Sequence, residues 1–313
     1  MGPGGRLGNR LWTYANLLAF AQDHGFDVFN PSFIESRCLF RKGSAGKPSR
    51  SALGSNVLRR LKLWLWRRAY SVNLRLRFFL SIDVGESGKF DVEAHPDDVM
   101  QFRKSGLVFL SGLFFAAPKC MARQRQYLLP YFALSDELEA RRLSLVASAR
   151  KGDDVLVGIH IRHGDYRTYC NGLMYYSTPE FVAVMRNLVN QVQDRNVRFL
   201  ICSDEPQSRS LFEGLDVVIS NEIAVVDLYA LAACDFICGP NSTFSQWASF
   251  YGGVPLHVLD YKAQFLRADQ SPNYSPRFDT DFSPFSTERF SQYSTQSLQI
   301  SDFVSRSRAW HRY

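Results

Sequence analysis

The chain has 313 residues, of which 46% are hydrophobic and 21% charged, and it carries a formal net charge of +7. Its length allows two core-forming domains of roughly 150 residues each, and its composition excludes an intrinsically disordered chain. No run of about 18 uncharged apolar residues occurs, and the first residues lack the pattern of a secretion signal. We therefore expect a cytoplasmic protein without a membrane-spanning helix.

The six cysteines form neither a zinc-binding nor a disulfide pattern. None belongs to a Cys-x-x-Cys pair, and the closest two, Cys234 and Cys238, have apolar neighbours. Structural zinc sites draw on Cys and His at short, regular spacings, which this chain lacks. We expect most of the cysteines to be small buried hydrophobic residues and the chain to hold no metal.

The first predicted elements are a glycine loop and a helix. Residues 4–9 (GGRLGN) lead into residues 10–24, whose apolar positions follow helical spacing, and Gly25 is expected to end the helix. Residues 27–30 then read as a strand. A glycine loop before a helix normally follows a strand, yet only residues 1–3 precede this one, so we expect the first strand to be missing.

Positive charge is concentrated in the first part of the chain. Residues 1–80 hold 14 Lys and Arg against 3 Asp and Glu, which leaves 23 against 27 for the remainder. Residues 41–56 are expected to form a loop. The densest basic stretch, residues 58–68 (LRRLKLWLWRR), mixes cations with Trp and Leu, as does a helix lying on the inner face of a membrane. A solvated basic flank is the alternative, and no nucleic-acid-binding motif accompanies the charge.

The remaining elements alternate between strands and helices. A strand at 107–110 and a helix at 135–147 complete the first predicted domain, residues 1–150, and residues 151–154 form the expected hinge. The second predicted domain, residues 151–265, is a doubly wound parallel sheet. Its strands are expected near 155, 197, 217, 236 and 254, with helices at 179–193, 206–213, 223–234 and 242–251. Residues 266–313, rich in Ser, Pro and Phe, are expected to be an irregular tail.

The most informative stretch is residues 155–166, where a β-branched run (VLVGIHI) ends in Arg162. Such a run is typical of a buried strand, and Gly164 and Asp165 are expected to turn the chain after it. In open α/β sheets ligands bind beyond the carboxyl ends of strands, and a guanidinium grips phosphate oxygens as a fork. Arg162 is therefore predicted to bind a diphosphate. The alternative is that it pairs with Asp165 and only staples the turn.

Two further strands end in polar residues at the same predicted edge. The predicted strand at 197–204 ends in the polar pair Ser203 and Asp204. The strand at 236–239 is followed by Asn241 or Ser242, either of which would cap a new helix. Free N–H groups at a helix start bind anions, and the hydroxyls of Ser242 and Thr243 add donors. One sheet edge is thus expected to offer an arginine, an acid and a helix N-terminus.

Five ordered motifs resemble those of α-1,2-fucosyltransferases, which are related to the α-1,6- and protein O-fucosyltransferases. The chain carries them as GGRLGNR at 4–10, HIRHGDY at 160–166, CSD at 202–204, DLYAL at 227–231 and NSTFSQW at 241–247. The resemblance spans roughly residues 4–260. It implies a GT-B-like α/β fold, two Rossmann-like domains facing across a cleft, with residues 1–150 on the acceptor side. It also implies transfer of fucose from GDP-fucose to a glycan hydroxyl, with inversion and in an α-1,2 linkage.

The resemblance also implies roles for individual residues. It places Arg162 of the HxRxxD motif on the β-phosphate of GDP-fucose. His160 approaches guanine, although a histidine on a strand is more often structural. Asp227 accepts hydrogen bonds from the guanine edge, for which an N-cap role is the alternative. Ser242 and Thr243 match the hydroxyl pair at the phosphates, and Asn9 reaches the donor from the opposite domain.

This chain departs from the family pattern at two positions. His163 stands where the family has a second arginine and is expected to supply a second cation, and Arg10 stands where the family has glutamine. Asp165 and Glu35 are the candidates for a general base. Because fixed cations can take the place of Mg²⁺ at a diphosphate, we expect transfer without metal or cofactor. The alternatives are another GDP-sugar transferase and a non-catalytic, membrane-associated protein that binds sugar nucleotides.

Overall fold

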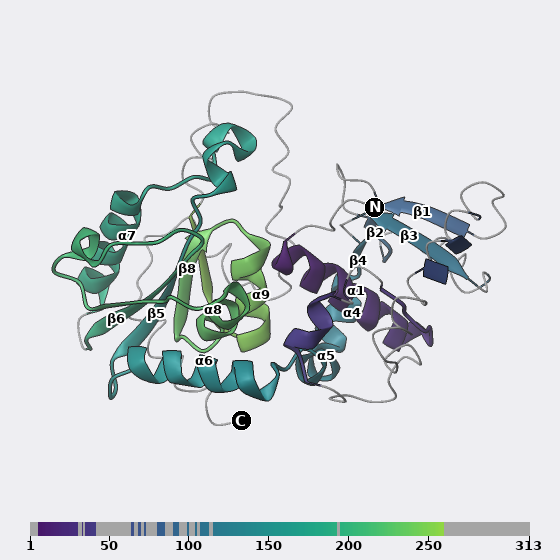
Figure 1. Cartoon of the computed structure of the whole chain (residues 1–313), viewed down its shortest axis with the longest axis horizontal. Helices are drawn as coiled ribbons and strands as arrows, with labels where there is room; N and C mark the ends of the chain where they lie inside the picture. Colours follow the sequence, from purple (N-terminus) through teal and green to yellow (C-terminus); the bar gives the residue numbers. More distant parts are fainter. Residues whose placement is uncertain are drawn as a thin grey trace. The chain divides into compact units, whose positions relative to one another are not determined.

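The structure is a computed structural model, which divides the chain into two compact units at the Ser135–Asp136 bond (Figure 1). It describes residues 6–30, 33, 35–41, 64–65, 68–69, 72, 80–84, 90–93, 99, 104, 107–112, 115–192 and 195–259. The first unit contains α1 (Leu7–His24), η2 (Glu35–Leu39), β1 (Leu80–Val84), β2 (Phe90–Asp91), β3 (Val108–Gly112), β4 (Phe115–Ala116), α4 (Pro118–Arg123) and α5 (Arg125–Tyr131).

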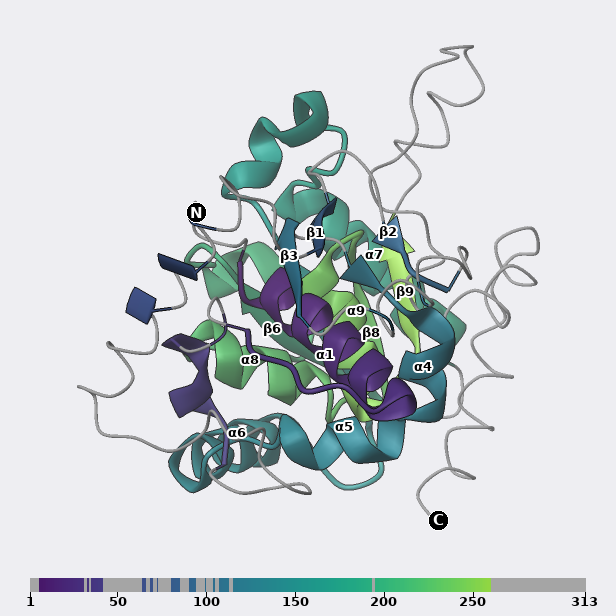
Figure 2. The same ribbon diagram turned by 90° about the vertical axis from the view of Figure 1, so that its right-hand side faces the viewer.

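Helix α1 confirms the helix predicted before Gly25 and organises the first unit. Gly25 ends it in the left-handed region, with φ 74°, where a glycine pays no steric penalty. The helix packs against α4 and α5 (Figure 2). Its buried Asn16 accepts a 2.8 Å hydrogen bond from the main-chain N–H of Ala117, just before α4. The Asn16 amide nitrogen donates to the Trp12 carbonyl oxygen at 2.9 Å, so both polar ends of this buried side chain are paired.

The strands within the described residues of the first unit form two parallel pairs, β1 with β3 and β2 with β4. The strand predicted at 107–110 is confirmed as β3. The strand predicted at 27–30 is wrong, since the structure assigns no strand to residues 26–30. Only Val28 and Phe29 of those four residues favour a strand, and the flanking Asp27 and Asn30 favour turns.

The second unit is built on a five-stranded, fully parallel sheet in the order β7-β6-β5-β8-β9. This order confirms the predicted doubly wound α/β fold, of the Rossmann-like type. Its elements are α6 (Asp136–Ala149), β5 (Val155–Ile161), η3 (Asp165–Arg167), η4 (Tyr169–Gly172), α7 (Thr178–Gln191), β6 (Val197–Ser203), η5 (Arg209–Phe212), β7 (Val217–Ile219), α8 (Ala224–Leu231), β8 (Phe236–Pro240), α9 (Thr243–Gly252) and β9 (Leu256–Leu259).

Helices cover both faces of this sheet (Figure 1). Phe181 and Met185 of α7 join one core with Ile159 and Ile161 of β5. On the other face, α8 packs against β5 and β6. Gly158 makes that packing possible, because a Cβ there would lie 2.6 Å from a Leu231 methyl group. All seven residues of β5 are buried, as expected for the central strand of a parallel sheet.

Helix α6 belongs to the second unit, whereas the sequence placed it at the end of the first. It packs against α8 and is joined to the segment before that helix by an ion pair between Arg141 and Glu222. Just beyond α6, Arg150 pairs with Asp235, which also accepts a 2.9 Å hydrogen bond from the Leu156 N–H. These contacts place the observed boundary before α6, and the expected hinge at 151–154 lies within the second unit.

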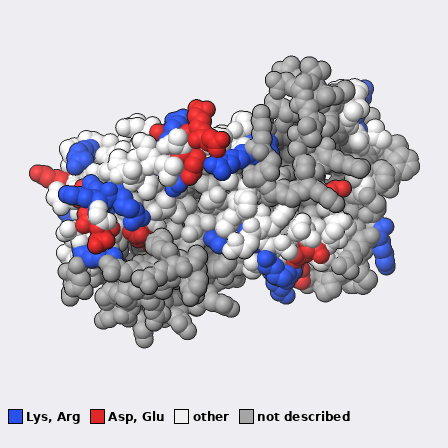
Figure 3. All heavy atoms as spheres, turned by 90° about the horizontal axis from the view of Figure 1, so that it is seen from below, with Lys and Arg blue, Asp and Glu red and all other residues white. Residues whose placement is uncertain are grey.

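The predicted basic stretch and the tail lie mostly outside the described residues. Within residues 58–68 only Trp64, Leu65 and Arg68 are described, and both apolar side chains are exposed. The predicted membrane contact therefore stays a prediction. Within the described part of the chain, no helix is both long and apolar enough to cross a membrane. On the face drawn in Figure 3 the described basic and acidic side chains lie intermixed.

Candidate functional site

The candidate site lies at the carboxyl ends of β5 and β8. From β5 the chain adds β6 and β7 on one side of the sheet and then β8 and β9 on the other. Open α/β sheets bind ligands at such a switch point, because the connections from the two central strands leave toward opposite faces. Residues 162–166 follow β5 and residues 241–243 follow β8, so the structure brings these two predicted segments to one edge.

Arg162 is held by residues of its own loop. Its Nε and Nη2 donate to the two carboxylate oxygens of Asp165 at 3.1 and 3.0 Å. Its Cζ lies 4.7 Å from the centroid of the Tyr166 ring. The turn-stapling pair considered from the sequence is therefore present. A guanidinium has five N–H donors in a fixed plane, so this pairing orients Arg162 and leaves donors for an anionic ligand.

Tyr166 is a site residue that the sequence analysis did not single out. Its ring is buried beneath Arg162, and its hydroxyl donates a 2.9 Å hydrogen bond to the carbonyl oxygen of Asn241. Burial raises the pKa of Tyr166 to about 12 and the nearby Arg162 charge lowers it, so the phenol keeps its proton at neutral pH. Its position at the end of the 160–166 motif was the sequence feature that could have identified it.

The start of α9 supplies the other side of the site. Ser242 is the N-cap, and its hydroxyl oxygen accepts a 3.2 Å hydrogen bond from the Phe244 N–H. Thr243 is the first residue of the helix. The buried Gln246 side chain donates to the Asn241 side chain at 2.9 Å, which fixes the turn into the helix. The remaining N–H groups of the first turn form an anion-binding end.

His160 is a buried, neutral residue beneath α9. Its Nδ1 lies 2.6 Å from the Ser245 hydroxyl oxygen, and its ring stacks on Phe244 at 4.8 Å between centroids. Burial and, to a smaller extent, the Arg162 charge together lower the pKa of His160 to about 3. With only 4% of its surface exposed, His160 here packs α9 onto β5, which is the structural role considered from the sequence.

His163 and Asp204 form a hydrogen bond with each other, and the His163 ring forms a second one to the main chain. The main-chain N–H of His163 donates to Asp204 at 2.8 Å, and Nε2 of its ring donates to the carbonyl oxygen of Tyr176 at 3.0 Å. The ring is buried and packs beside Tyr175. Asp204 therefore anchors the turn that carries Arg162. The geometry gives both residues structural contacts, and the donor contacts expected of them stay predictions.

Asp227 lies at the carboxyl end of β6 and β7, in the first turn of α8. It is buried and accepts a hydrogen bond from the Ser220 hydroxyl, so it is not an N-cap. Burial raises the pKa of Asp227 to about 6, against the lowering effect of hydrogen bonds from Ser220 and Cys202. A buried carboxylate at a ligand edge can accept hydrogen bonds from a base, and it becomes ionised near neutral pH.

We expect Asp227→Asn to remove a pH-dependent loss of stability. The folded-state pKa of about 6 lies above the ordinary aspartate value of 3.8, so the native state binds the extra proton, and stability falls as pH rises between these values. At pH 7.5 the cost of ionisation is on the order of 2–3 kcal/mol. Urea unfolding should show that the free energy of unfolding of the variant, relative to that of the wild type, increases from pH 4.5 to pH 7.5. Parallel curves for the two proteins would contradict the raised pKa.

Two predicted site residues, Asn9 and Glu35, belong to the first unit. Asn9 lies in the first turn of α1, in the first unit, and the structure does not fix how the two units sit relative to each other. Glu35 begins η2, and its side chain lies outside the described part of the structure. Both roles remain predictions.

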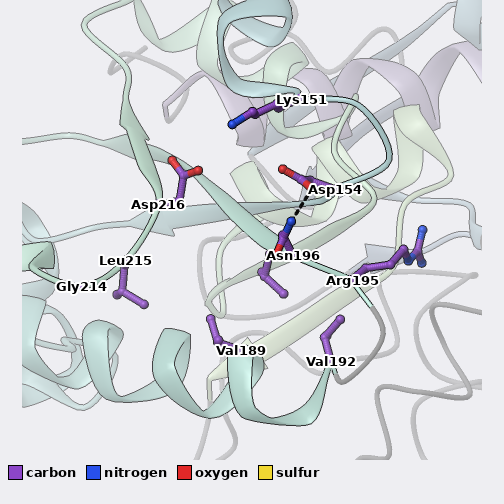
Figure 4. Close-up of a pocket in the computed structure, with 10 residues that line it drawn as sticks. Lys151, Asp154, Val189, Val192, Arg195, Asn196, Gly214, Leu215 and Asp216 are labelled. Atoms are coloured by element: carbon purple, nitrogen blue, oxygen red, sulfur yellow. Dashed lines mark hydrogen bonds between the residues drawn. The ribbon is translucent and has the colours of Figure 1, made fainter.

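A polar hollow of about 620 Å³ lies at the opposite edge of the sheet, at the amino ends of β5, β6 and β7 (Figure 4). Lys151, Asp154, Arg195 and Asp216 line it, and Asn196 donates to Asp154 at 3.2 Å. Ligands of open α/β sheets bind at the carboxyl ends of the strands. We therefore do not assign this hollow to the site around Arg162.

Comparison with known proteins finds similarity only among solved structures. No family model and no curated protein sequence matches. A NodZ α-1,6-fucosyltransferase soaked with GDP-fucose aligns at 18% identity and a TM-score of 0.49, covering 81% of this chain and 91% of that one. The fucosyltransferase NodZ from Bradyrhizobium aligns at 18% and 0.48, covering 81% and 92%. POFUT1 in complex with GDP aligns at 13% and 0.39, covering 53% and 58%. Because these TM-scores are below 0.5, we infer neither an activity nor a ligand from them.

Proposed function

We propose that the chain is a glycosyltransferase that transfers fucose from GDP-fucose to a glycan hydroxyl, with inversion and in an α-1,2 linkage. One observation carries the proposal. An oriented guanidinium, Arg162, and a capped helix start at Ser242 come together where a doubly wound sheet reverses. That combination suits the two charges of a diphosphate. The ordered motifs that resemble those of α-1,2-fucosyltransferases supply the identity of the nucleoside and of the sugar.

In this mechanism the acceptor hydroxyl gives its proton to a general base, for which Glu35 stays the predicted candidate. The hydroxyl oxygen forms a bond to the anomeric carbon of fucose as the bond from that carbon to the β-phosphate oxygen breaks. GDP leaves with the electron pair. Arg162 and the first turn of α9 stabilise the charge that develops on the leaving phosphate, and fixed donors of this kind are usually the largest catalytic term. Both oxygens of Asp165 accept from Arg162, so its role in the proposal is to orient that residue.

The donor can be identified by measuring nucleotide release from GDP-fucose, GDP-mannose and UDP-galactose, each with and without a galactoside acceptor. We expect release from GDP-fucose that increases with acceptor, and methylation analysis of the product should show substitution at O2 of galactose. Preference for another GDP-sugar would replace fucose in the proposal. Binding of GDP without turnover of any donor would identify a non-catalytic binding protein.

Activity is expected to survive EDTA, because the proposed diphosphate partners are a side-chain cation and main-chain donors. An Asp-x-Asp sequence, the spacing of a glycosyltransferase metal motif, does occur at residues 279–281, outside the described residues. The assay should therefore include dialysis against EDTA followed by addition of Mg²⁺ or Mn²⁺. A complete loss that either metal restores would contradict metal independence and direct attention to that segment.

A further inference from the structure

The central pair of strands is held together by its main chain for only part of its length. The register between β5 and β8 runs from Val157 to Ile159 on β5 and stops there. Beyond that point β5 continues paired with β6 to Ile161, and β8 continues paired with β9 to Pro240. The ends that present Arg162 and Ser242 are therefore not joined to each other by the sheet's own hydrogen bonds.

Tyr166 joins these two ends. Its face supports the Arg162 guanidinium at 4.7 Å, on the β5 side. Its hydroxyl donates at 2.9 Å to the carbonyl oxygen of Asn241, the residue before the N-cap of α9. The side chain is 5% exposed, so the hydrogen bond lies away from bulk water. One rigid ring thus contacts both groups that are proposed to hold the diphosphate.

We propose that Tyr166 is a positioning residue that sets the distance and angle between Arg162 and the start of α9. The inference rests on the proposed function and adds a residue to it. Asp165 holds the edge of the guanidinium through two hydrogen bonds, and Tyr166 supports its face. An arginine restrained on both its edge and its face keeps one orientation before the ligand arrives, which lowers the reorganisation needed in the transition state.

Two substitutions separate the functions of the ring and of the hydroxyl. Tyr166→Phe keeps the ring beneath Arg162 and removes the tie to Asn241. Tyr166→Leu removes both. We expect kcat for GDP-fucose to fall about tenfold in the first variant and about 100-fold in the second, because small misplacements at a reacting centre cost up to that much. The dissociation constant of GDP should rise less than kcat falls in both variants, since the charge of Arg162 remains.

Tyr229→Phe is the matched control. Tyr229 is also a buried tyrosine of this unit, in α8, where its ring packs against Tyr251. Tyr229→Phe also removes one buried hydroxyl, but it leaves Arg162 and its contacts unchanged. The control should keep wild-type kcat. If Tyr229→Phe and Tyr166→Phe lower kcat equally, or if Tyr166→Phe turns over like the wild type while the wild type is active, the positioning role is wrong and the proposed function stands.

A second measurement needs neither donor nor turnover. The Nε–H resonance of Arg162 in ¹⁵N-labelled, ligand-free protein, assigned with Arg162→Lys, reports how firmly the guanidinium is held. Tyr166→Phe should shift this resonance and speed its exchange with water, and Tyr166→Leu should do so more strongly. An unchanged resonance in both variants would overturn the proposal. If the wild type binds no GDP, the proposed function fails, and this measurement still decides the role of Tyr166.

Discussion

Replacing Arg162 with alanine should lower kcat with GDP-fucose by roughly 10² to 10³-fold, about 3–4 kcal/mol of transition-state stabilisation. The loss arises because the leaving phosphate gains charge as its bond to the sugar breaks, and Arg162 is the cation that Asp165 and Tyr166 hold at the proposed site. Steady-state release of GDP is the measurement. Arg162→Lys keeps the charge without the planar fork and should recover only part of the rate.

Arg198→Ala is the control for this experiment. Arg198 is similarly buried and similarly forked to an acid, Asp216, through bonds of 2.9 and 3.2 Å. It lies near the start of β6, at the opposite end of the sheet from the site. Its loss should leave kcat within about twofold, because surface and edge ion pairs contribute little to a distant reaction. Wild-type turnover by Arg162→Ala would show that the donor site proposed at β5 is wrong.

Replacing Gly252 with alanine should produce the largest loss of stability of any alanine substitution at the described glycines of the second unit. A Cβ at this last position of α9 would fall on the main-chain carbonyl oxygen of Ala232, which follows α8, and would also lie 2.9 Å from a Val254 methyl group. Because this carbonyl oxygen belongs to the main chain and cannot rotate away, α8 and α9 must move apart. We expect a loss on the order of 3 kcal/mol, against the gain that alanine normally brings to a helix.

Gly214→Ala provides the comparison. Gly214 has φ 80° and nothing within 4 Å of the position of a Cβ, so alanine there meets backbone strain alone. That strain costs about 1 kcal/mol. Urea unfolding of the two variants separates crowding from strain. Equal losses would show that α8 and α9 approach each other less closely at Gly252 than the structure has it.

Most predicted helices and strands of the second unit were recovered from the sequence because their signals are local. The α-helix predicted at 206–213 is wrong, since that segment holds only the four-residue 3₁₀ helix η5, and its proline and serines favour turns over a longer helix. The β-branched run before Arg162 and the Ser242 cap each lie within a few residues, and the alternation of strands and helices fixed the order of the sheet. The strand predicted at 27–30 was wrong because that segment has too few strand-forming residues. The assignment of α6 to the second unit depends on its packing against α8, to which the Arg141–Glu222 ion pair adds, and contacts between positions so far apart leave no local pattern.

The site was predicted in outline for the same reason. Arg162, Ser242 and Thr243 could be placed at one edge because each follows or begins an element that the pattern defines. The contact between His163 and Asp204 could not be predicted, because it depends on the turn after β5 meeting the end of β6. Tyr166 was overlooked since its partner, the carbonyl of Asn241, carries no sequence signal at all.

The turn after β5 also carries an evolutionary constraint. A Cβ on Gly164 would lie 2.8 Å from a carboxylate oxygen of Asp204, so a larger residue at 164 would displace the Asp204 side chain. Asp204 in turn holds the main chain of His163, next to Arg162. In homologues, then, positions 164 and 204 should change together while Arg162 stays constant, and a chain that keeps the arginine but has lost either partner should have rebuilt this turn by other means.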